Sequence, residues 1–275
     1  MSSVPLPPPA PLPLRWTAAC RARLRDAAET REGGFVLEGR KLVLDALARP
    51  DLVALEVWLA DDLPYEVADE LDAAARARGV RIGRAPARDL ERTSDVVAPQ
   101  GVLALAADPG RPAAEVARAR GAVVFLDGVQ DPGNVGAVLR SAAAFAFGGA
   151  LVATGSADPV GAKALRASAG ASLAVPFARG TTDALLGEVA AARRVVWLLD
   201  DEGDALWGVE RVPAGLVLAV GSEGRGASAA VRHAAARRVA VPIAPRVESL
   251  NAAVAFGIAA AHLARFAGAA RTGAK

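Results

Sequence analysis

Short apolar runs alternate with longer amphipathic segments along most of this chain. Runs rich in valine, leucine and alanine that end at glycine, proline or polar residues predict buried strands, and apolar residues spaced three or four apart predict helices. In the first half, these patterns predict strands at 35–37, 52–59, 80–82 and 102–106, and helices at 15–30, 40–48, 65–78 and 87–92. Strands that alternate with helices indicate a layered α/β domain.

The second half continues this alternation with uninterrupted apolar strands. The pattern predicts strands at 122–126, 150–153, 174–177, 195–199 and 216–220, and helices at 134–147, 159–167, 182–192 and 228–236. A final unit at 239–264 opens with a short apolar strand and Pro242, passes through a polar elbow and becomes a helix. Continuous apolar strands are typical of a parallel sheet whose two faces are both covered.

Changes in composition divide the chain into segments. Proline is concentrated in residues 1–14, which can neither pair in a sheet nor enter a helix, so we expect a disordered tail there. Proline, glycine and aspartate gather again at 107–112 and mark a domain boundary. We expect one domain at 15–107, a linker at 108–118 and a second domain at 119–268.

Composition narrows the classes of protein only moderately. Of the 275 residues, 53% are hydrophobic and 23% are charged, which indicates a globular protein with real cores. Arginine supplies almost all of the positive charge, which suits phosphate contacts but is equally explained by a compositional bias, and the net charge of +2 is small. A single cysteine and two distant histidines predict neither disulfides nor a metal site. Without an apparent membrane span or signal peptide, we expect a soluble cytoplasmic protein.

Three polar segments follow predicted strands and lead into predicted helices. The first contains Asn134 and Arg140, the second is glycine-rich and contains Glu223, and the third contains Ser249 and Asn251. Because ligands of open α/β sheets bind at the carboxyl ends of the strands, we expect the three segments to converge.

Three of these residues also have an ordinary structural explanation. Asn134 can cap the helix that follows it, Arg140 can be a surface arginine, and Glu223 can be a solvated loop charge. The glycine spacing of the second segment matches neither the dinucleotide-binding fingerprint nor a phosphate-binding P-loop. This mismatch argues against a nucleotide-dependent oxidoreductase.

Taken together and in this order, the three segments resemble the three motifs of the SpoU/TrmH family of RNA ribose 2'-O-methyltransferases, in the SPOUT superfamily. The matching positions are Asn134-x-Gly136-x-x-x-Arg140, Gly221-x-Glu223-Gly224-x-Gly226, and Pro242 followed by Glu248-Ser249-Leu250-Asn251. The resemblance covers about residues 123–266. Residues 35–47 resemble the start of the small RNA-substrate-binding domain that many members directed at ribosomal RNA carry. The sequence departs from the family pattern at Ser222 and Pro245, where asparagine and glycine are common.

The resemblance implies an α/β protein with a C-terminal parallel-sheet SPOUT domain that contains a trefoil knot. It also implies a smaller N-terminal α/β domain like a ribosomal protein, a homodimer, S-adenosyl-L-methionine as cofactor and no metal. The implied catalytic residues are Asn134, Arg140, Glu223, Ser249 and Asn251, and the implied cofactor-binding residues are Gly221, Val241, Ile243 and Leu250.

The leading hypothesis for function is therefore 2'-O-methylation of a ribose in RNA, with 23S ribosomal RNA as the expected substrate. Since arginine stays protonated in proteins, Arg140 is expected to stabilise negative charge on the ribose oxygen rather than to act as a base. A tRNA substrate and a catalytically inactive, ribosome-associated RNA-binding protein are the alternatives. Purified rRNA and tRNA as methyl acceptors would separate the two substrates, and S-adenosylmethionine binding would test the inactive alternative.

Overall fold

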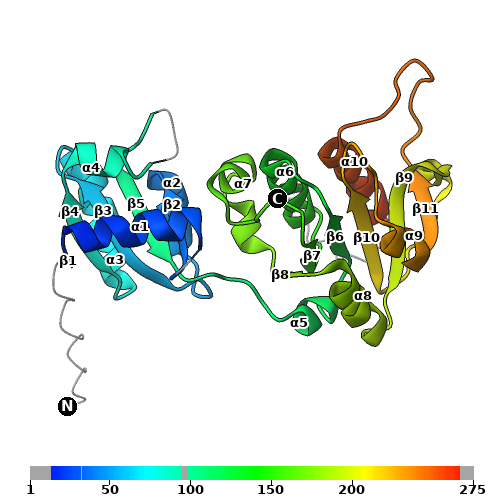
Figure 1. Ribbon diagram of the computed structural model, residues 1–275, viewed down its shortest axis with the longest axis horizontal. Helices are drawn as coiled ribbons and strands as arrows, with labels where there is room; N and C mark the ends of the chain where they lie inside the picture. The colour runs from blue at the N-terminus through cyan, green and yellow to red at the C-terminus, as the bar shows by residue number, and fades with distance from the viewer. Residues whose placement is uncertain (1–13, 32, 95–97, 267–275) are drawn as a thin grey trace, which may run out of the picture. The chain divides into compact units, whose positions relative to one another are not determined.

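The computed structural model describes residues 14–31, 33–94 and 98–266, and the chain divides into two compact units, Met1–Asp108 and Pro109–Lys275. The N-terminal unit runs from blue to cyan in Figure 1, and the C-terminal unit from green to red. The tail predicted at 1–14 lies outside the described residues except for Leu14, which is part of a strand and not of a tail.

The N-terminal unit is built on a five-stranded mixed sheet. Its elements are β1 (Leu14–Arg15), α1 (Ala18–Glu29), β2 (Phe35–Glu38), α2 (Arg40–Leu47), β3 (Ala54–Ala60), α3 (Tyr65–Ala77), β4 (Arg81–Ala85), α4 (Ala87–Glu91) and β5 (Val102–Ala106). The strand order is β1-β4-β3-β5-β2, in which β4 is parallel to β1 and β3, and β5 is antiparallel to β3 and β2. The sequence pattern predicted the layered α/β arrangement correctly.

The C-terminal unit contains a six-stranded sheet in which every pair of neighbours is parallel. Its elements are α5 (Ala113–Ala117), β6 (Val123–Asp127), α6 (Pro132–Ala144), β7 (Gly149–Ala153), α7 (Ala162–Ala167), the 3₁₀ helix η1 (Ala171–Ala174), β8 (Phe177–Gly180), α8 (Thr182–Ala191), β9 (Val195–Ala205), the 3₁₀ helix η2 (Leu206–Gly208), β10 (Leu216–Gly221), α9 (Ala229–Ala234), β11 (Ala235–Ala240) and α10 (Ala252–Ala264). The strand order is β11-β9-β10-β6-β7-β8. The apolar strands thus form the parallel sheet that they predicted.

Helices cover both faces of this sheet, as Figure 1 shows. On one face, α6 packs against α7 and α10, and α10 also contacts β10. On the other face, α8 packs between α5 and α9, and its Leu185 and Val189 join Phe125 of β6 and Val231 of α9 in a buried cluster. The helix α5 lies within the linker expected at 108–118, so that part of the expected linker belongs to the C-terminal core.

The position predicted for the third strand of this unit, 174–177, was wrong. The 3₁₀ helix η1 occupies Ala171–Ala174, and the strand β8 begins only at Phe177. The reason is a local polar bond network, because the buried Ser168 hydroxyl lies 3.0 Å from both the Leu165 carbonyl oxygen and the Ser172 hydroxyl. These bonds hold the chain in a turn where apolar residues alone suggest a strand.

The last strand also differs from the prediction. It spans Ala235–Ala240 rather than starting at Val239, so it carries Arg237 and Arg238 and ends before Pro242. Arginines are tolerated there because β11 is an edge strand, and its neighbour β9 extends beyond the predicted end into an acidic stretch that reaches Ala205. Sequence patterning missed the first part of this strand, because its polar side chains are paired and not buried.

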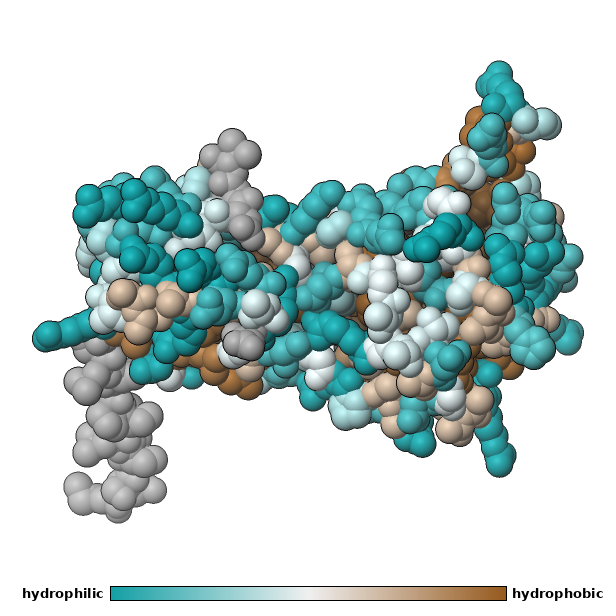
Figure 2. Space-filling view, in the orientation of Figure 1, coloured by the Kyte–Doolittle hydropathy of each residue, from teal (hydrophilic) through white to brown (hydrophobic). Residues whose placement is uncertain are grey.

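After β11, the chain leaves the sheet in a loop, residues 241–251, before returning at α10. Figure 1 shows this loop projecting beyond the elements around it, and Figure 2 shows hydrophobic and hydrophilic surface mixed along it. Its large apolar side chains include Ile243, 37% exposed, and Val247, 45% exposed. No helix in the described part of the chain combines the length and apolarity required to cross a membrane.

Candidate functional site

The first polar segment forms the start of α6, and its helix cap is Asp131 rather than Asn134. Asp131 Oδ1 accepts a hydrogen bond from the Gly133 amide at 3.1 Å, and Pro132 occupies the first helical turn, where its missing N–H has no consequence. Lys163 Nζ, 2.7 Å from Asp131 Oδ1, and the Gly133 amide lower the pKa of the Asp131 carboxyl. The alternative in which Asn134 caps this helix is therefore excluded, and its side chain is available for other contacts.

The Asn134 side chain connects the three polar segments. Its Nδ2 donates to Glu223 Oε1 in the second segment. Its Oδ1 accepts a hydrogen bond from Nδ2 of Asn251, in the third segment, at 2.9 Å. Residues that lie 89 and 117 positions away along the chain thus bond to the two ends of one amide. The structure brings together three of the five expected catalytic residues.

Asn251 has a second task in addition to its bond with Asn134. Its Oδ1 accepts hydrogen bonds from the backbone amides of Ala253 at 3.0 Å and Val254 at 3.3 Å, which caps the start of α10. The carbonyl oxygen of the side chain therefore holds the helix while the nitrogen faces α6. Folding of α10 and assembly of the three segments are coupled through this residue.

The second segment is a tight glycine-rich loop between β10 and α9. The backbones of Ser222 and Gly226 exchange two hydrogen bonds of 3.1 and 2.9 Å, and Gly226 has φ of +65°. A Cβ at Gly221 would collide with the Ala227 amide nitrogen and lie 2.7 Å from the Gly226 carbonyl oxygen. The two glycines allow the loop to fold back on the end of its own strand.

Asp127 holds this loop from the neighbouring strand, and sequence reasoning did not single it out. The carboxylate, buried at the end of β6, accepts hydrogen bonds from the Ser228 amide at 2.6 Å and from Thr182 Oγ1 at 3.1 Å. It therefore joins the starts of α8 and α9. A carboxylate that directly follows a wholly apolar strand was the available signal, because such a group is buried only when hydrogen-bonded.

Arg140 and Ser249, the other two expected catalytic residues, lie outside this hydrogen-bonded group. Arg140 is exposed on α6, about 9 Å along the helix axis from Asn134 at 1.5 Å per residue. In the described part of the chain, its guanidinium has no hydrogen-bond or ion-pair partner. Ser249 is an exposed residue of the 241–251 loop.

The expected cofactor residues are divided between two segments. Gly221 ends β10 and is half-buried, whereas Val241, Ile243 and Leu250 belong to the projecting loop. No hydrogen bond between described residues joins that loop to Gly221. The described residues also hold no cluster of three or more histidine, cysteine, aspartate or glutamate side chains placed to bind a metal ion.

Comparisons with known proteins show which family the chain belongs to. A sequence profile described as the SpoU rRNA methylase family matches residues 121–261, slightly more than half of the chain. The chain belongs to the SpoU rRNA methylase family. A second profile, described as RNA 2'-O ribose methyltransferase substrate binding, matches residues 36–112. The family match therefore extends to both compact units, as the sequence motifs suggested.

Individual relatives of this SpoU-family protein match nearly its whole length. A protein of Mycolicibacterium smegmatis, described as an uncharacterized tRNA/rRNA methyltransferase, is 36% identical over 94% of this chain and 87% of its own. The structure of a TrmH-family RNA methyltransferase from Porphyromonas gingivalis is 29% identical, with a TM-score of 0.77, and covers 92% of this chain and 99% of its own. An AdoMet-bound rRNA methyltransferase from Sinorhizobium meliloti is 25% identical, with a TM-score of 0.78, over 90% and 95%. These matches confirm the α/β SpoU fold.

Proposed function

We propose that this SpoU-family protein transfers a methyl group from S-adenosyl-L-methionine to a ribose 2'-oxygen of RNA, with 23S ribosomal RNA as substrate. The observation that carries the proposal is the hydrogen-bonded group Glu223–Asn134–Asn251, which unites the three motifs at the start of α6, the helix that also bears Arg140. The substrate-binding profile and the AdoMet-bound relative support the choice of ribose and cofactor.

The residues near the hydrogen-bonded group Glu223–Asn134–Asn251 fit an adenosine-containing cofactor. S-adenosylmethionine contains an adenine ring with apolar faces and hydrogen-bonding edges. It also contains a positively charged sulfonium whose methyl group is electrophilic. The glycine loop after β10 exposes backbone close to the end of the strand, and Gly224 has no atom within 4 Å of where a Cβ would lie. Ile243 and Leu250 provide apolar side chains that are not fully buried. We assign Gly221, Val241, Ile243 and Leu250 to cofactor binding on this basis.

The protein's part in the reaction is to orient and stabilise the ribose oxygen. A ribose hydroxyl is a weak nucleophile until it loses its proton, so groups that favour negative charge on oxygen accelerate the step. Arg140 is exposed and its guanidinium has no hydrogen-bond or ion-pair partner among the described residues, so it can make such a contact or hold a phosphate. Glu223, Asn134 and Asn251 fix the surrounding loops, and Ser249 is an exposed residue two positions before Asn251, whose hydroxyl can bond to the RNA.

Methyl transfer from radiolabelled S-adenosylmethionine to purified rRNA and tRNA tests this proposal. Wild-type protein should label rRNA in preference to tRNA, and the modified position should resist alkaline cleavage, because a methylated 2'-oxygen cannot attack the adjacent phosphate. Arg140→Ala should lose at least a hundredfold in kcat while retaining cofactor binding. Arg118→Ala changes an exposed arginine that directly follows α5, at the opposite face of the sheet, and is the matched control. Labelled RNA that remains alkali-sensitive at the modified nucleotide would exclude ribose methylation.

We further propose that the active form is a cytoplasmic homodimer. The helix α10 is apolar on nearly all sides, yet Val254 on it is 50% exposed, which leaves apolar surface for a second copy. Sedimentation equilibrium should give twice the mass of one chain. A monomer at micromolar concentration that still methylates RNA would contradict this assembly.

A further inference from the structure

Asp200 is a buried carboxylate outside the three motifs. It lies in β9 where pairing with β11 is interrupted, since Arg238 is opposite Leu198 but Val239 is opposite Asp204. Its side chain is only 6% exposed. A carboxylate so removed from water requires charged or hydrogen-bonding partners, and losing one of them is strongly unfavourable.

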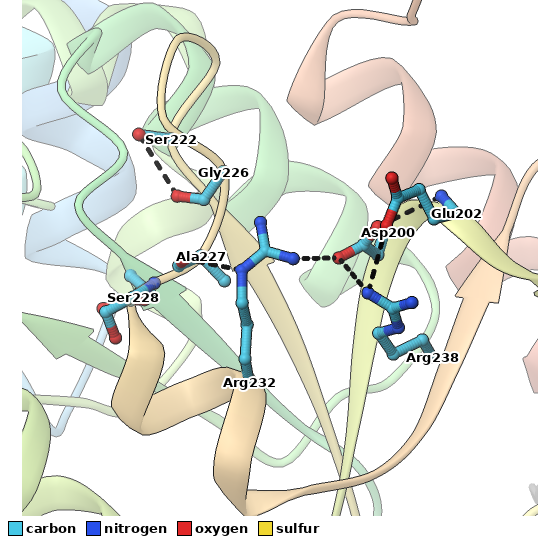
Figure 3. Close-up of polar contacts among 9 residues, drawn as sticks. Asp200, Glu202, Ser222, Gly226, Ala227, Ser228, Arg232 and Arg238 are labelled. Carbon is cyan, nitrogen blue, oxygen red and sulfur yellow. Dashed lines mark hydrogen bonds and ion pairs between the residues drawn. The ribbon is translucent and has the colours of Figure 1, made fainter.

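Arg232 of α9 supplies the main partner and at the same time holds the glycine-rich loop. Its Nη1 is 2.9 Å from Asp200 Oδ2, and its Nε donates to the Ala227 carbonyl at 3.1 Å. A Cβ at Gly226 would lie 2.7 Å from Arg232 Nη2, so the guanidinium rests against the loop backbone. Figure 3 shows this guanidinium between the loop and Asp200.

Arg238 connects the same carboxylate to the strand that leads into the third motif. Its Nη1 lies 3.8 Å from Asp200 Oδ2 and 3.4 Å from Glu202 Oε2. Arg238 belongs to β11, which ends at Ala240, directly before the 241–251 loop. Figure 3 shows Arg232 and Arg238 converging on Asp200 from α9 and β11. The buried Asp200 carboxylate thus contacts both Arg232, which bonds to the loop of the second motif, and Arg238, on the strand that precedes the third motif.

We propose that Asp200 and Arg232 are positioning residues that hold the Gly221–Ser228 loop in the conformation that binds S-adenosylmethionine. This inference rests on the proposed function. The Ser222–Gly226 bridge shapes the loop internally, but the Arg232–Asp200 pair attaches it to β9. Without the pair, the loop keeps its bonds to Asp127 and Asn134 but loses its attachment to β9, and the cofactor must restore that attachment site's order on binding.

The test measures cofactor binding by calorimetry and steady-state kinetics in Asp200→Asn, Arg232→Gln and Arg232→Lys. We expect the Kd and KM for S-adenosylmethionine to rise about tenfold in the first two, with kcat restored at saturating cofactor and the KM for RNA unchanged. Arg232→Lys keeps the charge but cannot reach both Asp200 and the Ala227 carbonyl, so it should give an intermediate increase. The double variant should resemble the single variants, because both break the same link.

The matched control is Arg237→Gln, which removes another arginine–aspartate pair between β11 and β9. Arg237 Nε is 3.1 Å from Asp204 Oδ2, and that carboxylate is 69% exposed, so the pair is solvated and its loss should leave the KM for S-adenosylmethionine within twofold of wild type.

General destabilisation would give a different result, since partial unfolding lowers the amount of active enzyme and hence kcat, with KM unchanged. Such a result, or wild-type Kd values in folded Asp200→Asn and Arg232→Lys proteins, would overturn the positioning role. If Asp200→Asn does not fold, the amide hydrogen-exchange rates of residues 221–228 in Arg232→Lys provide the test. Exchange rates equal to those of the wild type would overturn the positioning role. Failure of the wild-type protein to bind S-adenosylmethionine would instead refute the proposed function.

Discussion

Single side chains in this protein use their atoms for separate tasks. The Asn134 amide donates to Glu223 and accepts from Asn251, and the Asp127 carboxylate accepts from two helix starts. Each of these side chains therefore contributes two separate contacts to the site. A change that preserves size but alters one atom should therefore affect one task and spare the other.

The Asp131 cap of α6 provides a pH-dependent prediction at this scale. Lys163 is the largest cause of the lowered Asp131 pKa, so Lys163→Met should raise that pKa towards its ordinary value. A lowered pKa stabilises the folded state above the unfolded pKa, and this contribution disappears as pH falls through the folded value. In the variant the cap should therefore weaken at a higher pH than in wild type.

A carbon-13 NMR titration of the Asp131 carboxyl measures this change directly. Lys41→Met is the matched control, because Lys41 pairs with Asp45 in the N-terminal unit at 2.5 Å. Superimposable titration curves for wild type and Lys163→Met would show that Lys163 does not control this carboxyl.

Packing of elements also depends on where a glycine lies. A Cβ at Gly136 of α6 would lie 2.8 Å from Ala167 Cβ and 3.0 Å from the Ser168 nitrogen, and would collide with the Ala164 carbonyl oxygen. Gly136→Ala should therefore push α7 from α6 and lower the free energy of unfolding by about 1–3 kcal/mol, despite the better helix propensity of alanine.

Gly187 of α8 is the matched control, since no atom lies within 4 Å of the position of its Cβ. Gly187→Ala should raise the free energy of unfolding by up to about 1 kcal/mol, because alanine reduces the entropy of the unfolded chain and favours the helix. Urea denaturation of the two variants should give changes of opposite sign. A stabilised Gly136→Ala protein would show that α6 and α7 can separate without loss.

The sequence was most informative about elements that bury apolar residues. The strands β6, β7 and β10 were predicted within one or two residues, because each is apolar over nearly all of its length. Patterning missed the first part of β11 and the acidic end of β9, because paired charges there replace burial. It identified Asn134, Glu223 and Asn251 as candidates, but not Asp200 or Arg232, because their importance arises from contacts between distant segments.

At the scale of the whole molecule, each compact unit has its own buried core. Leu24 of α1 packs with Trp58, Leu103 and Leu105 in the N-terminal unit, and Phe125 is central to the C-terminal one. The trefoil knot stays a prediction, because strand order and register do not define how the chain threads. The expected domains at 15–107 and 119–268 likewise stay a proposal, which a truncated protein can test.

We predict that a fragment of residues 109–275 folds and binds S-adenosylmethionine like the full chain, because the motif residues and their partners all belong to this unit. Its kcat/KM for RNA should fall at least tenfold, since the segment that matches the substrate-binding profile is missing. Calorimetry and methyl-transfer kinetics on the fragment provide the measurement. Undiminished kcat/KM would show that the N-terminal unit does not recognise RNA.

Because Asn251 both begins α10 and bonds to Asn134, the first turn of that helix is a natural reporter of the state of the site. Any event that draws Asn251 away from Asn134 also disturbs the amides of Ala253 and Val254. Their NMR signals would therefore register substrate arrival without a label attached to the protein.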